Sequence, residues 1–241
     1  IKTLLSRIDE SSIIKWKELS GDQSKEIIFQ EIWNDSMTQS NADLIDLLDK
    51  KSVLLYGVST RKLNVEKNGV SISVLDPYDT VIDPLTNAWD VESARFIIHQ
   101  NIFRNVRDII ADPSYSEEGK RELKIWVDSP AGMTQGGRNK ENWEDKMKRL
   151  ESMGVGHGDF SLFAGGDRII NLTEHMTTIW NTKTKKPERR VVVYADDTIK
   201  LRDVSLMEAI GVDFWPYIRW SEDPEINDNY PDSVADTIRT P

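Results

Sequence analysis

The stretch that decides the fold runs from Leu54 to Pro84 and reads LLYGVSTRKLNVEKNGVSISVLDPYDTVIDP. It predicts the end of a helix, a β-hairpin and a following strand. With a two-residue type I′ turn at Asn68-Gly69, the hairpin would pair Lys67 with Val70, Val65 with Ile72, and Leu63 with Val74. The period of two gathers the apolar side chains on one face. Asp76-Pro77 and Asp83-Pro84 then end the strands, since proline cannot donate to a ladder.

Composition limits the classes of protein that this chain can belong to. Its 241 residues suffice for one large or two small domains, with roughly 70% of the unfolded surface buried. The absence of cysteine excludes disulfides and thiolate metal sites. A net charge of −10 argues against a general grip on nucleic-acid phosphates. No apolar run approaches the ~20 residues of a membrane span, so we expect no membrane partner.

The first half of the chain predicts helices around the hairpin. Residues 1–40 are expected to be helical with a loop near Ser20-Gly21, and a second helix should run from an Asn41 N-cap to Tyr56 and end at Gly57. Arg95–His99 reads as a strand. Asn101 is expected to cap a short helix that Asp112-Pro113 ends.

The second half predicts a helical and loop region followed by a β-meander. Residues 117–127 should be helical, Ser129–Asn139 a flexible loop, and the segment around Trp143, Met147 and Leu150 a helix stopped by Gly154. Three strands should follow, at Ile169–Thr182, Arg189–Ala195 and Thr198–Arg202, before an aromatic segment at Phe214–Ile218. The order of elements predicts an α+β fold, with helices packed on antiparallel hairpin and meander sheets.

Five segments in this order resemble the portal proteins of tailed bacteriophages, in the region of the wing domain. They are LLYG before a strand, VLDPYDTVIDP, ESARFIIHQNIFRNVRDII, RRVVVYADDTIKLRD and FWPYIRWSEDPEINDNYPDSVADTI. Together with the helix that ends in LLYG and the hairpin that runs into VLDPYDTVIDP, they cover about half of the chain, and Ser114–Asp167 lies outside them as an expected insertion. The chain begins with Ile1, and the family's stem helices, clip and tunnel loop would follow Pro241, so we expect a fragment of a longer protein.

The resemblance implies a structural subunit and no enzyme. It implies a homo-oligomeric ring, usually a dodecamer, at one vertex of the virion capsid, assembled in the host cytoplasm. Its implied partners are copies of itself, the major capsid protein, the terminase packaging motor and head-completion or adaptor proteins. Double-stranded DNA would pass through the channel during packaging and ejection without sequence-specific binding. No catalytic, cofactor-binding or metal-binding residue is expected, and no cofactor.

Four segments are expected within this wing-like architecture. They are a helical segment at 1–57, the hairpin with the strand and helix of the wing core at 58–113, a helical and loop insertion at 114–167, and the meander with an extended segment leading to the stem at 168–241.

Tyr194-Ala195-Asp196-Asp197 supports an alternative from another class. It is similar to the YxDD turn of reverse transcriptases, whose paired carboxylates bind two magnesium ions. A nucleotidyl transferase also needs a third carboxylate, for which Asp128, Asp159 and Asp167 are the candidates. The plainer interpretation is an acidic turn between two strands. A non-portal virion adaptor module is the other alternative.

The remaining candidate sites have plain structural interpretations. Gly154–Asp159 lacks the lysine and hydroxyl residue of a phosphate loop, and Gly136-Gly137-Arg138 reads as a bare loop. His99, His157 and His175 share no metal-ligand spacing. Asp76, Asp79 and Asp83 read as turn formers. The basic run of Lys183, Lys185, Lys186, Arg189 and Arg190 reads as a solvated hairpin tip that could also touch DNA or a partner. The eight tryptophans are expected to anchor the core and subunit interfaces, at positions 16, 33, 89, 126, 143, 180, 215 and 220.

Overall fold

The computed structural model describes residues 23–39, 41–66, 69–86, 90–152, 168–221 and 233. The predicted α+β class is confirmed: helices pack on two antiparallel sheets. The chain divides into two compact units. Among the described residues, the first unit comprises 23–39, 41–66, 69–75, 216–221 and 233, and the second unit comprises 76–86, 90–152 and 168–215.

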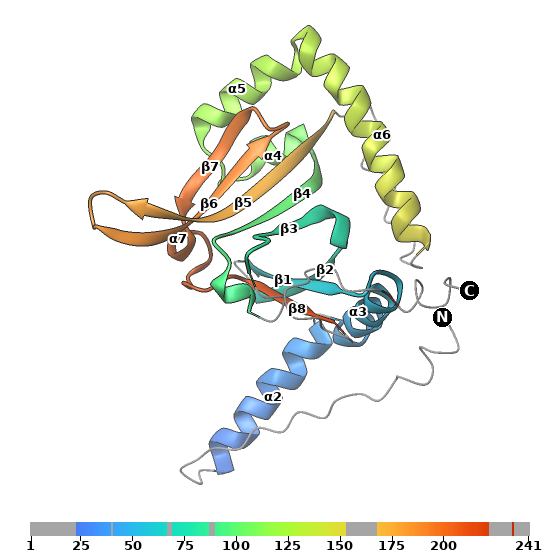
Figure 1. Ribbon diagram of the computed structural model, residues 1–241, viewed down its shortest axis with the longest axis vertical. Coiled ribbons are helices and arrows are strands. Elements are labelled where there is room, and N and C mark those ends of the chain that lie inside the picture. Colours follow the sequence, from blue (N-terminus) through green and yellow to red (C-terminus); the bar gives the residue numbers. More distant parts are fainter. Residues whose placement is uncertain are drawn as a thin grey trace. The chain divides into compact units, whose positions relative to one another are not determined.

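The first unit combines two helices with a three-stranded sheet in the order β2-β1-β8 (Figure 1). Its elements are α2 (Gln23–Gln39), α3 (Ala42–Tyr56), β1 (Ser59–Glu66), β2 (Gly69–Leu75) and β8 (Tyr217–Trp220). The predicted end of α3 is confirmed, because Gly57 adopts a left-handed φ of 75° and its amide donates to the Val53 carbonyl. Asn41 precedes α3 as expected, but its side chain makes no capping hydrogen bond.

A buried carboxylate fixes α3 to the sheet of the first unit. Asp49 is fully buried and accepts hydrogen bonds from the Ser59 hydroxyl and from the Arg61 guanidinium. Arg61 also reaches Asp46 at 3.2 Å. Ser52 donates to the Val58 carbonyl at 2.8 Å. The turn between α3 and β1 is therefore held by side chains from both elements.

The predicted hairpin forms, but its predicted register is wrong by two residues. Val65 pairs with Val70 and Leu63 with Ile72, and the ladder closes on Glu66 and Gly69. Two residues still separate the strands, and they are Lys67 and Asn68 instead of Asn68 and Gly69. Because partners move by two, every side chain keeps its expected face.

The second unit is built on a five-stranded antiparallel sheet in the order β3-β4-β5-β6-β7. The strands are β3 (Thr80–Ile82), β4 (Phe96–Asn105), β5 (Ile169–Asn181), β6 (Lys186–Ala195) and β7 (Ile199–Ser205). The helices are η1 (Pro77–Asp79), η2 (Val91–Ser93), α4 (Val106–Ala111), α5 (Glu117–Val127), α6 (Pro130–Ser152) and α7 (Leu206–Ile210). The predicted meander and the predicted helix over 117–127 are both confirmed.

Alternating apolar residues of the meander form the core of the second unit. Ile97, Leu172, Met176, Val191 and Leu201 are each at most 2% exposed. The β5–β6 hairpin extends past β7, since β7 pairs with residues 190–195 of β6 whereas β5 and β6 pair out to Asn181 and Lys186 (Figure 1). The end of this hairpin is thus two-stranded.

The strand β4 is longer than predicted, which corrects the role of Asn101. A bulge between His99 and Ile102 places Asn101 at a φ of 57°, and the strand then continues to Asn105. Asn105, instead of Asn101, caps the short helix: its side chain accepts from the Arg107 amide at 2.9 Å. Asparagine is suited both to left-handed backbone positions and to helix N-caps. Residue type alone therefore did not distinguish the bulge at Asn101 from the cap at Asn105.

The predicted loop at Ser129–Asn139 is wrong, because these residues form the first turns of α6. Pro130 occupies the first helical position, where its missing amide costs nothing. The Ser129 hydroxyl accepts from the Gly132 amide at 3.1 Å and so caps the helix. A Cβ at Gly132 would lie 2.2 Å from the Trp126 carbonyl oxygen. The glycine therefore permits a tight corner between α5 and α6.

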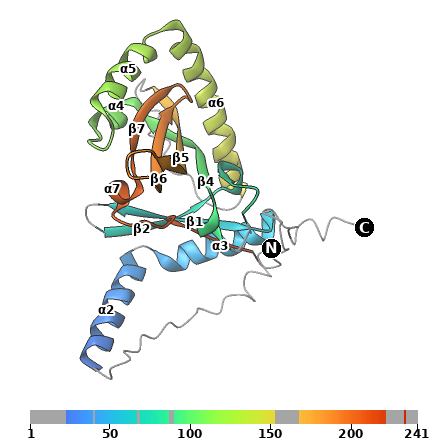
Figure 2. The same cartoon turned by 60° about the vertical axis from the view of Figure 1, so that its left-hand side comes forward.

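The helices α5 and α6 form two arms that meet at this corner (Figure 2). At the other end of α5, the Ser116 amide donates to the Leu201 carbonyl of β7 at 2.8 Å. Gly119 allows a close approach, because a Cβ there would lie 2.5 Å from the Lys200 carbonyl oxygen. The free edge of β7 is thereby covered by α5.

Several predictions concern residues outside the described ranges. They are the structure of residues 1–22, the stop at Gly154, the glycine-rich segment at 154–166, and the segment after Ser221 apart from Ser233. The division into 1–57, 58–113, 114–167 and 168–241 stays a prediction.

Candidate functional site

The Asp196-Asp197 pair forms the predicted turn, between β6 and β7. Both residues have positive φ, at 44° and 58°. This is the backbone of the primed turns that suit the twist of a two-stranded hairpin. The Asp196 amide donates to the Asn171 carbonyl of β5 at 2.8 Å, which fixes the turn to a neighbouring strand.

Neutral side chains hold both carboxylates of this turn. Asn139 of α6 donates to Asp196 Oδ1 at 2.8 Å, and Thr173 of β5 donates to Asp197 Oδ1 at 2.9 Å. Burial raises the pKa of Asp196 to about 6, although hydrogen bonds with the Asn139 side chain and the Asn171 backbone oppose this shift. Asp196 Oδ2 is buried and has no hydrogen-bond partner among the residues that the structure describes. The arrangement fastens the turn to α6 and β5.

The third carboxylate that a metal-dependent enzyme needs is not found beside this turn in the described ranges. Asp128 ends α5 as an exposed residue and pairs with Arg168 at 3.1 Å. Asp159 and Asp167 lie outside the described residues. Within the residues that the structure describes, no three histidine or carboxylate side chains are grouped to hold a metal ion.

The acidic stretch from Asp76 to Asp83 forms turns, as predicted, and its buried carboxylates also form ion pairs. Asp76 accepts from the Tyr78 amide and Asp83 from the Leu85 amide, each at 3.0 Å. Asp83 also pairs with Arg95 at 2.7 Å. The hydrogen bond from Arg95 lowers the pKa of Asp83 to about 2.

Two cations of α6 complete this acidic cluster. Lys146 lies 2.5 Å from Asp79 Oδ2, and Arg149 lies 3.2 Å from Asp76 Oδ2. Both carboxylates are fully buried. Sequence reasoning missed these pairs, and the available signal was the spacing of Lys146 and Arg149 on one face of a helix. Their recognition required α6 to be placed correctly.

The bulge at Asn101 connects the two acidic regions. Its side-chain amide donates to Asp79 Oδ1 at 2.9 Å, and its backbone carbonyl accepts from Lys146 at 2.9 Å. Its Oδ1 accepts from Asn171 of β5 at 3.2 Å. One polar network therefore joins η1, β4, β5 and α6. Its groups contact one another, which is the pattern of a structural support.

The other predicted candidates are dispersed. His99 lies in β4 and His175 in β5, where the His175 ring meets the Tyr194 ring edge-on at 5.6 Å. His157 and Gly154–Asp159 lie outside the described residues. Gly136-Gly137-Arg138 is part of α6 and is not the predicted loop.

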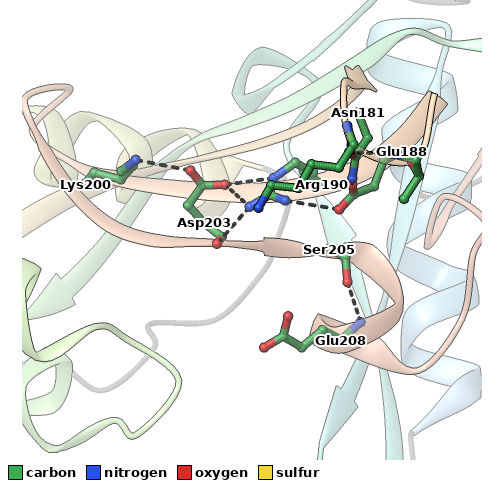
Figure 3. A network of polar contacts seen from close by, with 9 residues as sticks. Asn181, Glu188, Arg190, Lys200, Asp203, Ser205 and Glu208 are labelled. Atoms are coloured by element: carbon green, nitrogen blue, oxygen red, sulfur yellow. Dashed lines mark hydrogen bonds and ion pairs between the residues drawn. The ribbon is translucent and has the colours of Figure 1, made fainter. Parts of the chain in front are cut away.

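The predicted basic run divides into two parts. Arg190 reaches Asp203 at 2.6 Å and Glu188 at 3.0 Å, and Lys200 reaches Asp203 at 3.1 Å (Figure 3). Arg189 pairs with Glu92, and its guanidinium lies 4.8 Å from the centre of the Trp215 ring. The lysines at 183, 185 and 186 are exposed at the end of the hairpin. The predicted solvated tip therefore consists of the three lysines, while both arginines support the hairpin base.

The buried tryptophans fit the predicted anchoring role. Trp143 and Trp215 are 5% and 3% exposed, and the Trp215 indole donates to the Ala94 carbonyl at 2.9 Å. Trp180, by contrast, is 64% exposed near the end of the β5–β6 hairpin. It marks this hairpin as a surface available for contact.

A groove lies at the base of the same hairpin. Its cavity measures about 600 Å³ and is open to solvent. It is lined by Glu92 and Arg95 before β4, Thr178 of β5, Pro187 and Arg189 of β6, and Met207 of α7, among others.

The helix α2 displays a group of exposed apolar side chains. Ile27, Ile28, Phe29 and Ile32 are each between 54% and 60% exposed. Surfaces of this kind mark contacts with other molecules. None of the helices in the described ranges has the length and hydropathy to cross a membrane.

No protein-family model matches this chain, and no curated protein matches it.

Proposed function

We propose that this chain is the wing region of a portal-ring subunit of tailed bacteriophages. It is a structural protein of the capsid vertex, and it contributes to a channel for DNA without catalysing a reaction. Its partners in this role are further copies of itself in a closed ring, the major capsid protein, the packaging motor and head-completion proteins. The resemblance of the five ordered segments supports this role.

The observation that carries the proposal is the contrast between buried charges and exposed apolar residues. The acidic residues that suggested chemistry are engaged with groups of neighbouring elements, as Asp79 is with Lys146 and Asp196 is with Asn139. Large apolar side chains, such as Ile28 and Trp180, face solvent instead. This distribution is typical of a subunit that buries further surface on assembly.

The alternative of a nucleotidyl transferase has less support. In that mechanism paired carboxylates hold two metal ions at the reacting phosphate. Here both carboxylates are held by side chains of neighbouring elements, Asp196 by Asn139 and Asp197 by Thr173. Among the described residues, no third carboxylate is grouped with them to hold such ions. The double change Asp196→Asn and Asp197→Asn should leave ring formation intact. Magnesium-dependent primer extension by the parent protein, abolished in this variant, would support the transferase instead.

Negative-stain microscopy of the full-length protein tests the proposal. We expect rings with a central hole and one uniform number of subunits. A protein that stays monomeric under all assembly conditions would contradict the portal role. Particles without a central channel would favour the adaptor alternative.

A further inference from the structure

The groove at the base of the β5–β6 hairpin is lined mostly by polar and charged residues, and exposed apolar residues lie in its lining or close to it in sequence. Met207, which lines it, is 55% exposed, and Phe214, next to the lining residue Asp213, is 48% exposed. Trp180 lies two residues beyond the lining residue Thr178 and opposite Pro187, so strand periodicity places it on the same face. We call this surface, with its rim of Trp180, Met207 and Phe214, the hairpin-base groove.

The end of the hairpin beside this groove is positively charged. Lys183, Lys185 and Lys186 are exposed, and in the described part of the chain none of their ammonium groups has an ion-pair partner. Arg189 and Arg190, by contrast, are paired with acidic residues of the same unit. In a chain of net charge −10, such a cluster fits a negatively charged partner surface.

The helix α2 has the complementary properties. Ile28, Phe29 and Ile32 fall within an arc of about 100° on a helix of 3.6 residues per turn. Glu31 and Asp35 lie beside this stripe. With Glu26, the helix carries three carboxylates against one lysine. It therefore offers an apolar stripe with a negative border, where the hairpin-base groove offers an apolar rim with a positive border.

We propose that α2 of one copy of this chain lies in the hairpin-base groove of the next copy. An amphipathic helix that packs its apolar face against exposed apolar side chains is a recurrent mode of recognition, and the charges along its border set its direction. The contact uses two different surfaces of the chain, so it is heterologous and can close a ring by rotation. This inference rests on the proposed ring and names the surfaces that join its subunits.

Disulfide crosslinking tests the contact directly, because the chain has no cysteine of its own. The full-length protein with both Ile28→Cys and Met207→Cys should form, on oxidation, a ladder of covalent multimers on a denaturing gel. Each single variant should remain below the trimer. A disulfide that forms only within one chain would overturn the proposed contact.

Charge reversal provides a second test with a rescue. Lys183→Glu, Lys185→Glu and Lys186→Glu together should lower the fraction of protein in rings at least about tenfold, since like charges would then face each other. Adding Glu31→Lys and Asp35→Lys should restore rings. Lys148→Glu, at a 72% exposed position of α6, is the matched control and should have no effect.

The outcomes separate this inference from the proposed function. Rings that persist unchanged after the triple reversal would overturn the contact and leave the portal proposal standing. Absence of rings from the parent protein would overturn the portal proposal, and with it the contact that depends on it.

Discussion

The two acidic turns of the second unit look alike in sequence and differ in their surroundings. The DPYD turn places Asp76 and Asp79 against Arg149 and Lys146, whereas the YADD turn places Asp196 against the amide of Asn139. In the neighbouring turn at Asp83-Pro84, the Arg95 guanidinium lowers the pKa of Asp83 to about 2, whereas burial in the YADD turn raises the pKa of Asp196 to about 6. An aspartate in a turn therefore gains or loses its charge according to the side chains of distant segments.

The comparison also shows what each turn contributes to the fold. The DPYD turn uses charge to attach α6 to η1, which requires a cation opposite each buried carboxylate. The YADD turn is held by hydrogen bonds and has left-handed backbone conformations. The negative charge of its buried carboxylate destabilises the folded chain. Three substitutions test this difference.

The largest effect is expected from Lys146→Ala. The change leaves Asp79 buried without its closest cation, with Arg149 3.8 Å away and the Asn101 amide as its remaining partners. We expect a loss of about 3 kcal/mol in the free energy of unfolding, measured in urea at pH 7.5. Lys148→Ala, which removes an exposed pair with Asp145 on the same helix, should cost below about 0.5 kcal/mol. Equal losses in the free energy of unfolding for the two variants would show that the buried ion pair contributes no more stability than the exposed one.

A smaller effect of opposite sign is expected from Asp196→Asn. The pKa of Asp196 is about 6 in the folded chain against an ordinary value of 3.8, so its stabilising protonated form is complete below pH 3.8 and is lost as the pH rises through 6. Asparagine keeps the oxygen that accepts from Asn139 and tolerates a φ of 44°.

The expected gain is about 1–2 kcal/mol at pH 7.5, reduced by partial solvent exposure, and close to zero at pH 4. Urea unfolding at both pH values measures it. A gain of equal size at both pH values would contradict a raised pKa.

The smallest effect is expected from Asp83→Asn. The pKa of Asp83 is lowered to about 2, so its contribution to stability is present above pH 3.8 and is lost as the pH falls toward 2. Thermal unfolding at pH 7 should show a Tm lower by a few degrees, because asparagine cannot form the ion pair with Arg95. The difference from the parent protein should shrink between pH 4 and pH 2.5. A difference that stays constant over this range would point to lost packing.

Much of the fold could be predicted because local patterns determined it. The apolar alternation of β5, β6 and β7 and the glycine after α3 were sufficient signals. The local pattern did not determine the hairpin register, since turns at Lys67-Asn68 and at Asn68-Gly69 both leave two residues between the strands and keep each side chain on the same face. The start of α6 was hidden because its glycines suggest a loop, and Gly132 is explained by its contact with Trp126.

The surroundings of the candidate sites were less predictable. That Asp196-Asp197 forms a turn follows from residue type, but Asn139, which holds Asp196, is 57 residues away in a segment read as a loop. The pair of Asp76 with Arg149 spans 73 residues. Such contacts depend on which helix crosses which turn, and no local pattern encodes that.

The corner at Gly132 has a mechanical consequence. One arm of the helix pair is bonded to β7 through Ser116, and the other is bonded to the segment beside β3 through Lys146 and Arg149. The two arms thus act as a strap across both margins of the five-stranded sheet. Neither margin can fray alone without loosening the other, so a pull on the helix pair is shared by the whole sheet.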